Sequence, residues 1–253
     1  MLFDGWIAFL LLTVRCLGFY SVGPLFTQIR IPGQIQVLAS VATAVALFPT
    51  IDQTTWNPQA PLIEYAILIA REVFLGGLLG MVASASFIAI RFGGQLVGIQ
   101  MGFSLAQVFD PVARQEVPLV GKLQESLCVL LFLILDGHHI LLRGLGFSVQ
   151  KIGPGGFPDP YLLFDTVLSV GGSVFLLALQ VGAPVLAALF LTDAALGFVA
   201  RTVPQMNIFL IGIPIKIAAG LLFLVVITPL FGSLVRVHTL RLESQFLAIL
   251  AGM

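Results

Sequence analysis

Charged residues are scarce in this sequence: Asp, Glu, Lys and Arg make up 9% of its 253 residues. A soluble domain has about 25% charged residues, and the mean hydropathy here is +1.08, so the composition excludes a water-soluble globule. Lys plus Arg (12) balance Asp plus Glu (12). No excess of positive charge therefore points to nucleic acid or another polyanion as a partner. The composition predicts an integral membrane or membrane-assembly protein.

Cysteine and histidine are also rare, with two and three residues respectively. Cys16 and Cys128 both lie in apolar runs, which favours reduced, packed side chains over a disulfide, although a pairing stays open. The sequence contains no pairing of a nucleophile with a base, no phosphate-binding glycine loop and no cofactor motif. It therefore predicts a protein that is not an enzyme and holds no cofactor. The first apolar segment lacks a basic leader and a cleavage site, and we interpret it as a retained span.

Long apolar stretches make up most of the chain. A helix needs about 20 residues to cross a bilayer, and the candidate spans are 5–25, 35–51, 62–90, 119–149, 161–191 and 208–235. The Gly/Gln-rich stretch 92–108 is a weaker helix candidate. No alternation with a period of two residues is present, which disfavours a transmembrane β-barrel. We therefore predict an all-α fold of integral-membrane type.

Proline and glycine divide these stretches. Polar turns are expected at 28–34 and 52–61, and GPGGFPDP (153–160) is the best candidate for an internal boundary. A proline inside a helix removes a backbone hydrogen bond and kinks the helix, and three lie in the late spans: Pro184, Pro214 and Pro229. Kinked helices and helical hairpins packed against other protein are therefore expected. The Lys and Arg distribution favours an N-terminus outside and a C-terminus inside the cell.

Several ionisable side chains interrupt the apolar spans: Arg15, Arg71, Glu72, Asp136 and Lys216. A charge in the middle of a bilayer costs at least about 2.5 kcal/mol, so each of these must be paired or surrounded by protein. An ion or proton relay is the functional alternative. Because the charges are scattered and of both signs, we favour structural pairing at helix interfaces.

Glycines recur every fourth residue in two regions, at Gly76 and Gly80 and again at Gly94, Gly98 and Gly102. On a helix this spacing places the glycines on one face, where another backbone can approach closely. The contact can lie within one bundle or between subunits, and the sequence favours neither.

The run LILDGHHILLRGL raises the question of a metal site. On a helix, Asp136, His139 and Arg143 share one stripe, whereas His138 points elsewhere. A zinc site needs three or four converging ligands, and two adjacent histidines do not readily face one ion from a helix. We therefore expect a hydrogen-bonded interface that includes Asp136 and His139, and no metal.

A charged island, FDPVARQEVP, interrupts the apolar chain at residues 109–118. Its prolines restrict the backbone, its charges suit an aqueous environment, and its apolar residues suit packing against neighbours. Taken alone, the segment would be an ordinary surface turn. The residues of interest in it are Phe109, Asp110, Pro111, Val112, Arg114, Glu116 and Pro118.

An ordered set of motifs carries a family resemblance. It consists of Arg15, Pro24-Leu-Phe, Ile31-Pro32, Arg71-Glu72 with Gly76 and Gly80, Phe109-Asp110-Pro111 with Pro118, Asp136-Gly-His-His, Pro184, and Pro204-Gln-Met-Asn-Ile-Phe leading to Gly212-Ile-Pro-Ile-Lys216. The set, which covers about residues 10–235, resembles the FliR family of bacterial flagellar export proteins, whose virulence-secretion counterparts are the SctT proteins. The FDP and DGHH segments are closer to the flagellar type.

This resemblance implies an export-gate subunit of a type III secretion system in the bacterial inner membrane, at the flagellar basal body. FliR-like proteins assemble with FliP and FliQ, next to other export apparatus proteins, into a helical pore complex that unfolded flagellar proteins cross. The resemblance implies a FliP-like part (1–157) and a FliQ-like helical hairpin (158–253). It also implies that 109–118 is a plug that closes the pore at rest, and that the complex sits largely above the membrane plane.

Three other functions compete with this one. The first is a subunit of a virulence-type (SctT) gate. The second is a secondary transporter of a small solute, which would work as a single chain and usually has an internal repeat; we find no such repeat. The third is a membrane-embedded hydrolase that uses Asp136, His138 and His139, which a stoichiometric metal in the purified chain would favour.

Overall fold

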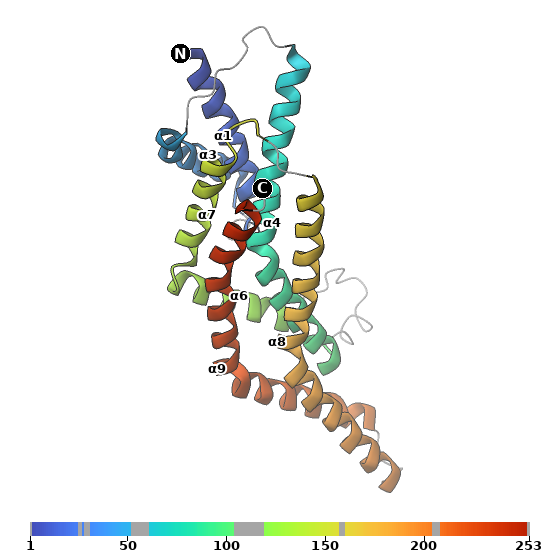
Figure 1. Cartoon of the computed structure of the whole chain (residues 1–253). Coiled ribbons are helices and arrows are strands. Elements are labelled where there is room, and N and C mark those ends of the chain that lie inside the picture. The colour runs from blue at the N-terminus through green and yellow to red at the C-terminus, as the bar shows by residue number, and fades with distance from the viewer. Residues whose placement is uncertain are drawn as a thin grey trace. The chain divides into compact units, whose positions relative to one another are not determined.

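The structure is a computed structural model that describes residues 2–24, 27, 31–51, 61–103, 119–156, 160–203 and 208–251. All regular secondary structure in these ranges is helical, which confirms the all-α prediction for this part of the chain (Figure 1). The elements are α1 (Leu2–Val22), α3 (Gly33–Leu47), the short 3₁₀ helix η1 (Phe48–Thr50), α4 (Leu62–Met101), α6 (Leu119–Ile134), α7 (Gly137–Lys151), α8 (Pro160–Thr202) and α9 (Ile208–Ala251).

Five of the described helices are long and apolar enough to cross a membrane, and the bent pair α6 and α7 raises the number to six if it is one span. These helices correspond to the six apolar stretches of the sequence. The stretch 92–108 was a weaker helix candidate, and its first part, up to Met101, belongs to α4, which continues without a break from Leu62. Gly93 and Gly94 lie inside this helix, and each lies against another helix backbone, at Ala178 and Gly121 respectively.

Hydroxyl side chains within the helices satisfy their own hydrogen bonds. Thr13, Ser40, Ser84 and Thr192 each donate to the backbone carbonyl four residues earlier, at distances of 2.7 to 2.9 Å. A polar group in an apolar environment needs such a partner. The pattern therefore suits helices that face lipid or apolar protein.

The chain divides into two compact units, each built from separate segments of the sequence. Unit 1 comprises Met1–Ala85, Leu133–Gly171 and His238–Met253. In it α1 contacts α3, and the Tyr20 and Thr43 hydroxyls link these helices at 2.8 Å. Cys16 is buried here as a free thiol, as expected from its apolar surroundings.

Unit 2 comprises Ser86–Phe132 and Gly172–Val237. Its core joins α4, α6 and α8 through a buried cluster made of Val97, Met101, Val120, Val185 and Leu189, and α9 packs against this cluster through Leu224 and Ile227. Phe87 of α4 meets Phe132 of α6 edge to face, with ring centroids 5.1 Å apart. Cys128 is buried in this unit, also as a free thiol.

Prolines and one strained residue mark irregular points of the helices. Pro184 lies inside α8, and Pro214 and Pro229 lie inside α9; the ribbon of α9 is bent and not straight (Figure 1). Between α6 and α7, Asp136 has a φ of 55°, a left-handed conformation that a residue other than glycine rarely adopts. This turn separates the two helices of the bent pair.

Candidate functional site

A buried ion pair connects α1 and α4 in unit 1. The Nε of Arg15 donates to Oε2 of Glu72 at 2.5 Å, and its Nη2 donates to Oε1 at 3.0 Å. The side chains are 1% and 0% exposed, respectively. This paired fork geometry, with both carboxylate oxygens engaged, is the strongest form of a side-chain ion pair.

The rest of the Arg15 guanidinium binds the end of α7. Nη1 donates to the carbonyls of Ser148 (3.1 Å) and Ile152 (2.8 Å), and Nη2 donates to the carbonyl of Gly153 (3.2 Å). Together with the two bonds to Glu72, these account for all five N–H donors of a guanidinium group. The charge therefore fastens three helices in one geometry.

Glu72 also anchors the GPGG segment that follows α7. Its Oε1 accepts a hydrogen bond from the backbone N–H of Gly155 at 2.7 Å. Gly155 has a φ of 81°, which favours glycine at this position. Arg71, the neighbour of Glu72 in the sequence, is exposed on α4.

Glycines of α1 and α4 bring the two backbones into contact beside this ion pair. A Cβ placed on Gly76 would overlap the carbonyl oxygen of Arg15, and one on Gly80 would lie 2.6 Å from the carbonyl oxygen of Phe19. Gly18 of α1 completes the contact, because a Cβ there would lie 2.6 Å from the carbonyl oxygen of Val73. Only glycine fits at these three positions without a shift of backbone.

Two glycines of the second set, Gly94 and Gly98, lie on α4 in unit 2. A Cβ on Gly94 would meet the backbone of Gly121 on α6 at 2.7 Å. A Cβ on Gly98 would make only an ordinary contact of 3.6 Å with Val120. Gly102 lies just after the end of α4 with a φ of 93°, so it serves the turn and not the helix face.

A group of three polar side chains joins α4, α8 and α9 in unit 2. Lys216 Nζ lies 2.8 Å from Asp193 Oδ1, and Gln100 Nε2 donates to Asp193 Oδ2 at 3.0 Å. The side chains of Lys216 and Asp193 are 21% and 36% exposed. We call these residues, Gln100, Asp193 and Lys216, the polar triad.

The apolar cluster of unit 2 contains both flanks of the segment 104–118. Val120, the second residue of α6, belongs to the buried cluster, and Phe103, just beyond the end of α4, packs against it. The residues predicted to form the plug, 109–118, lie outside the described part of the chain. The structure thus places the two flanks together but does not describe the segment itself.

The DGHH segment forms the start of α7 in unit 1. The side-chain atoms of Asp136, His138 and His139 that could bind a metal ion all lie within 4.8 Å of one another. The expectation that the two adjacent histidines point in different directions was therefore wrong. The left-handed backbone of Asp136 at the helix start accompanies this convergence. Asp136 and His139 are 75% and 59% exposed, with Oδ1 and Nδ1 3.5 Å apart. Asp136 and His139 therefore form a solvent-exposed polar contact at the start of α7.

Two acidic residues with ion-pair partners were missed in the sequence. Asp193 is the only acidic residue between 166 and 242. A single acid within an apolar span indicates a paired charge, and this was the signal that could have identified it. Glu125 is 1% exposed and contacts Lys122 (3.2 Å) and Arg91 (3.7 Å). Its helix, α6, has an apolar composition that gave no sign of a buried carboxylate.

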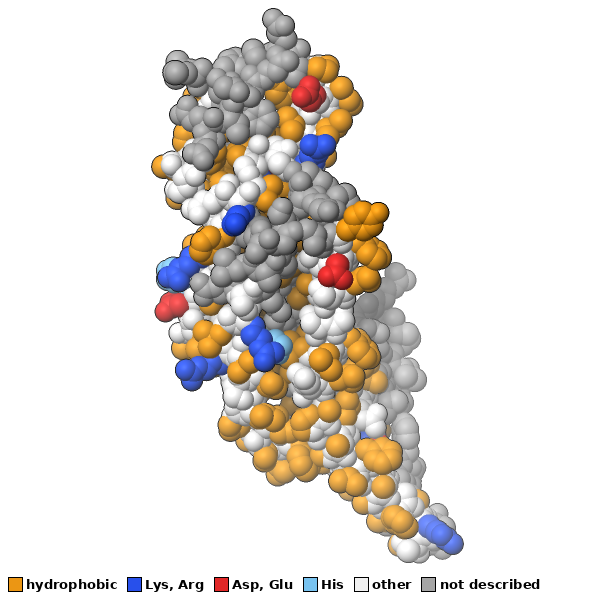
Figure 2. Space-filling model, in the orientation of Figure 1, with side chains coloured by type: hydrophobic (Ala, Val, Ile, Leu, Met, Phe, Trp, Pro, Cys, Tyr) orange, Lys and Arg blue, Asp and Glu red, His pale blue; other side chains and the backbone are white. Residues whose placement is uncertain are grey.

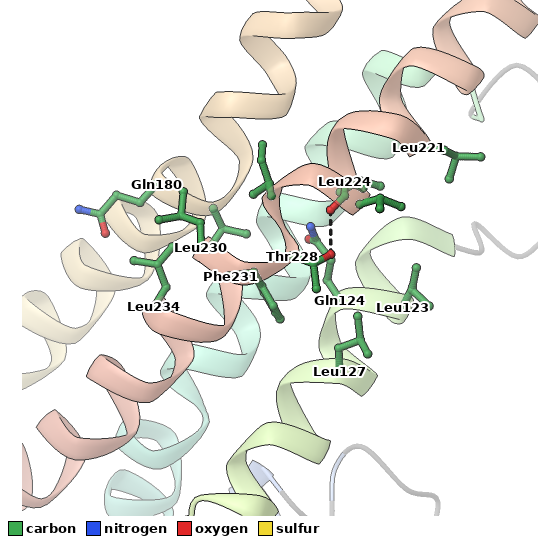
Figure 3. Close-up of a pocket in the computed structure, with 13 residues that line it drawn as sticks. Leu123, Gln124, Leu127, Gln180, Leu221, Leu224, Thr228, Leu230, Phe231 and Leu234 are labelled. Atoms are coloured by element: carbon green, nitrogen blue, oxygen red, sulfur yellow. Dashed lines mark hydrogen bonds between the residues drawn. The ribbon is translucent and has the colours of Figure 1, made fainter.

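Large apolar surfaces remain uncovered on the chain. Hydrophobic side chains occupy much of the visible face (Figure 2), and only 11% of the residues in the most apolar stretch of Leu210–Leu242 are buried. Unit 2 also has a cavity of about 370 Å³ between α6, α8 and α9. Leucines such as Leu123, Leu127 and Leu221 line it, with Gln124 and Thr228 as polar groups (Figure 3).

Comparisons with known proteins show which proteins the chain is similar to. The family model described as "Bacterial export proteins, family 1" matches residues 6–242. The chain is 36% identical over 244 residues to the flagellar biosynthetic protein FliR of Bacillus subtilis (strain 168), with 94% of this chain and 93% of that protein covered. It is 27% identical to FliR of Escherichia coli (strain K12), with 86% and 82% covered. It is 24% identical to the Yop proteins translocation protein T of Yersinia pestis, with 87% and 85% covered.

Proposed function

Because the chain belongs to the bacterial export proteins, family 1, which includes the FliR proteins, we propose that it is a subunit of the flagellar type III protein export gate. It forms a pore with FliP-like and FliQ-like subunits, and unfolded flagellar proteins cross the inner membrane through this pore at the flagellar basal body. The family consists of export proteins, so the chain is not an enzyme. The similarity to FliR over nearly the full length of both proteins carries the proposal.

A virulence-type gate subunit is the second candidate. The similarity to the Yop proteins translocation protein T supports this alternative, because it also covers most of both chains. The identity of 36% to one FliR, against 24% to the Yop protein, favours the flagellar system.

The exposed apolar helices support an assembly with partner subunits. In Gly33–Thr50 and in Leu210–Leu242 only 11% of the residues of the most apolar stretch are buried. Apolar surface of this extent must be covered by lipid or by protein. In the gate proposal, FliP-like and FliQ-like neighbours cover part of this surface. Residues 1–157 form the FliP-like part of the chain, and residues 158–253, which contain α8 and α9, form the FliQ-like hairpin.

Co-purification separates the gate from a solute transporter that works as one chain. We expect the tagged chain to leave detergent-solubilised membranes together with two smaller hydrophobic proteins. A tagged membrane protein of unrelated fold from the same cells is the control. Recovery of the chain as a stable monomer that takes up a solute after reconstitution would contradict the gate proposal.

The segment 109–118 is proposed as the plug of this pore. A resting pore wide enough for a polypeptide would dissipate ion gradients, so it needs a seal. The packing of Phe103 and Val120 supports this role, because both flanks of the segment are held by the same apolar cluster of unit 2. We expect deletion of 110–116 to raise the resting ion conductance of reconstituted complexes. Unchanged conductance in complexes that still assemble would remove the plug assignment.

A further inference from the structure

Three side chains at the start of α7 form a cluster of groups that can bind a metal ion. Asp136, His138 and His139 all lie in unit 1, and each offers one ligand atom within 4.8 Å of the other two. We propose that these three residues bind a divalent transition-metal ion, with Zn²⁺ as the best match. The inference goes beyond the proposed function as a gate subunit and does not depend on it.

The arrangement of the two histidines removes the main objection to a metal site. The sequence argued against one because adjacent histidines on a regular helix were expected to diverge. In the structure the rings of His138 and His139 lie side by side, with centroids 4.2 Å apart and planes tilted by 38°. One ring nitrogen of each can therefore reach the same point beside Asp136.

Asp136 supplies the negative charge that a cation needs at this position. It is the left-handed N-cap residue of α7, with a φ of 55°, and its Oδ1 lies 3.5 Å from Nδ1 of His139. The helix dipole disfavours a cation at a helix N-terminus, and the carboxylate offsets this effect. Arg143, one turn after His139, is exposed, so solvent screens its positive charge.

The types of ligand indicate which ion fits. Imidazole nitrogens together with a carboxylate are typical zinc ligands, whereas Mg²⁺ and Ca²⁺ prefer oxygen ligands alone. Bonds of about 2.0–2.2 Å place the ligand atoms of a tetrahedral zinc site about 3.3 Å apart, close to the 3.5 Å between Asp136 and His139. These two side chains are 75% and 59% exposed, so they are free to rotate and close the longer distances.

The third ligand, His138, has a nitrogen that lacks a partner. Its Nδ1 is buried and makes no hydrogen bond within the ranges that the structure describes, although a buried polar atom normally has a partner. A metal ion at the cluster would supply one. Three protein ligands leave a fourth position for water. Because the family consists of export proteins, we assign the cluster as a binding site and not as a catalytic centre.

The test measures binding of Zn²⁺ and Co²⁺ to the complete detergent-purified complex, isolated with a tag that contains no histidine. Titration calorimetry gives the number of ions and their affinity, and the visible absorption of Co²⁺ reports its ligands. Asp136→Asn and His139→Gln should each weaken Zn²⁺ binding by at least about tenfold, since loss of an outer-shell partner alone costs about 10- to 100-fold. Asparagine tolerates a left-handed backbone, so Asp136→Asn removes the charge and keeps the turn.

The parent complex should bind one ion more per copy of this chain than either variant, a difference in which ions held by other subunits cancel. His238→Gln is the matched control, because His238 is the remaining histidine of the three in the chain, and it should leave binding unchanged. Zn²⁺ should displace Co²⁺, and Mg²⁺ should not.

Three results would overturn the metal site. They are equal Zn²⁺ binding by the parent and both variants, an equal loss of binding with His238→Gln, and displacement of Co²⁺ by Mg²⁺ at the same concentration as by Zn²⁺. Should one of the two variants fail to assemble, the other decides, because both change exposed side chains. The proposed function as a gate subunit stands with each of these results.

Discussion

Two ion pairs in apolar helices, one in each unit, differ in how they are held. In unit 1, Arg15 and Glu72 are at most 1% exposed, and every N–H of the guanidinium has an acceptor. In unit 2, Asp193 and Lys216 are partly exposed and have a single ion-pair contact between them, extended by Gln100. Both pairs connect helices that are far apart in the sequence.

The difference in burial indicates a difference in role. Breaking a fully buried and saturated pair leaves a charge without water, so the pair fixes one arrangement of α1, α4 and the end of α7. When a partly exposed pair separates, water can replace its hydrogen bonds, so the separation costs little free energy. The Arg15–Glu72 pair therefore has the character of a rigid junction, and the Asp193–Lys216 pair has the character of a contact that can separate.

Removal of Arg15 is expected to have the largest effect on stability. Arg15→Leu leaves the buried Glu72 without its partner and should destabilise the chain by about 3–5 kcal/mol. The double variant with Glu72→Leu should be less damaging, because no lone charge remains. Asp193→Asn should cost about 1 kcal/mol or less. The melting temperature of the detergent-purified complex measures all three, and equal losses for Arg15→Leu and Asp193→Asn would contradict the comparison.

The glycine contact of unit 1 is expected to have a smaller effect. Gly76→Ala forces a methyl group into the carbonyl of Arg15 and should cost about 1–3 kcal/mol, as other overpacked positions do. Gly171→Ala is the control, because a Cβ at Gly171 in α8 has nothing within 4 Å; it should be neutral or stabilise the helix by about 0.5–1 kcal/mol. Thermal melting of the two variants under the same conditions tests the contact. Equal melting temperatures would show that the α1–α4 approach is not tight.

Sequence motifs identified the family before any comparison, and the match over residues 6–242 confirms that identification. The all-α prediction and the apolar spans are confirmed for the described residues, because helix formers and uninterrupted apolar length are properties of single segments. The boundary at 157 and the roles given to individual residues stay predictions. Burial also differs along the chain in a way that the sequence did not distinguish: Glu72 is buried, whereas its neighbour Arg71 is exposed.

The sequence by itself determined that the protein is helical, apolar and a member of an export family. Composition, the length of apolar runs and the order of motifs are properties of the linear sequence and need no tertiary contact. Only the tertiary structure decided which charges meet. Arg15 is 57 residues from Glu72 and Lys216 is paired with the unremarked Asp193, and no local pattern encodes such partners. The physical reason is that a charge in an apolar span signals the need for a counter-charge, but its identity depends on which helices lie side by side.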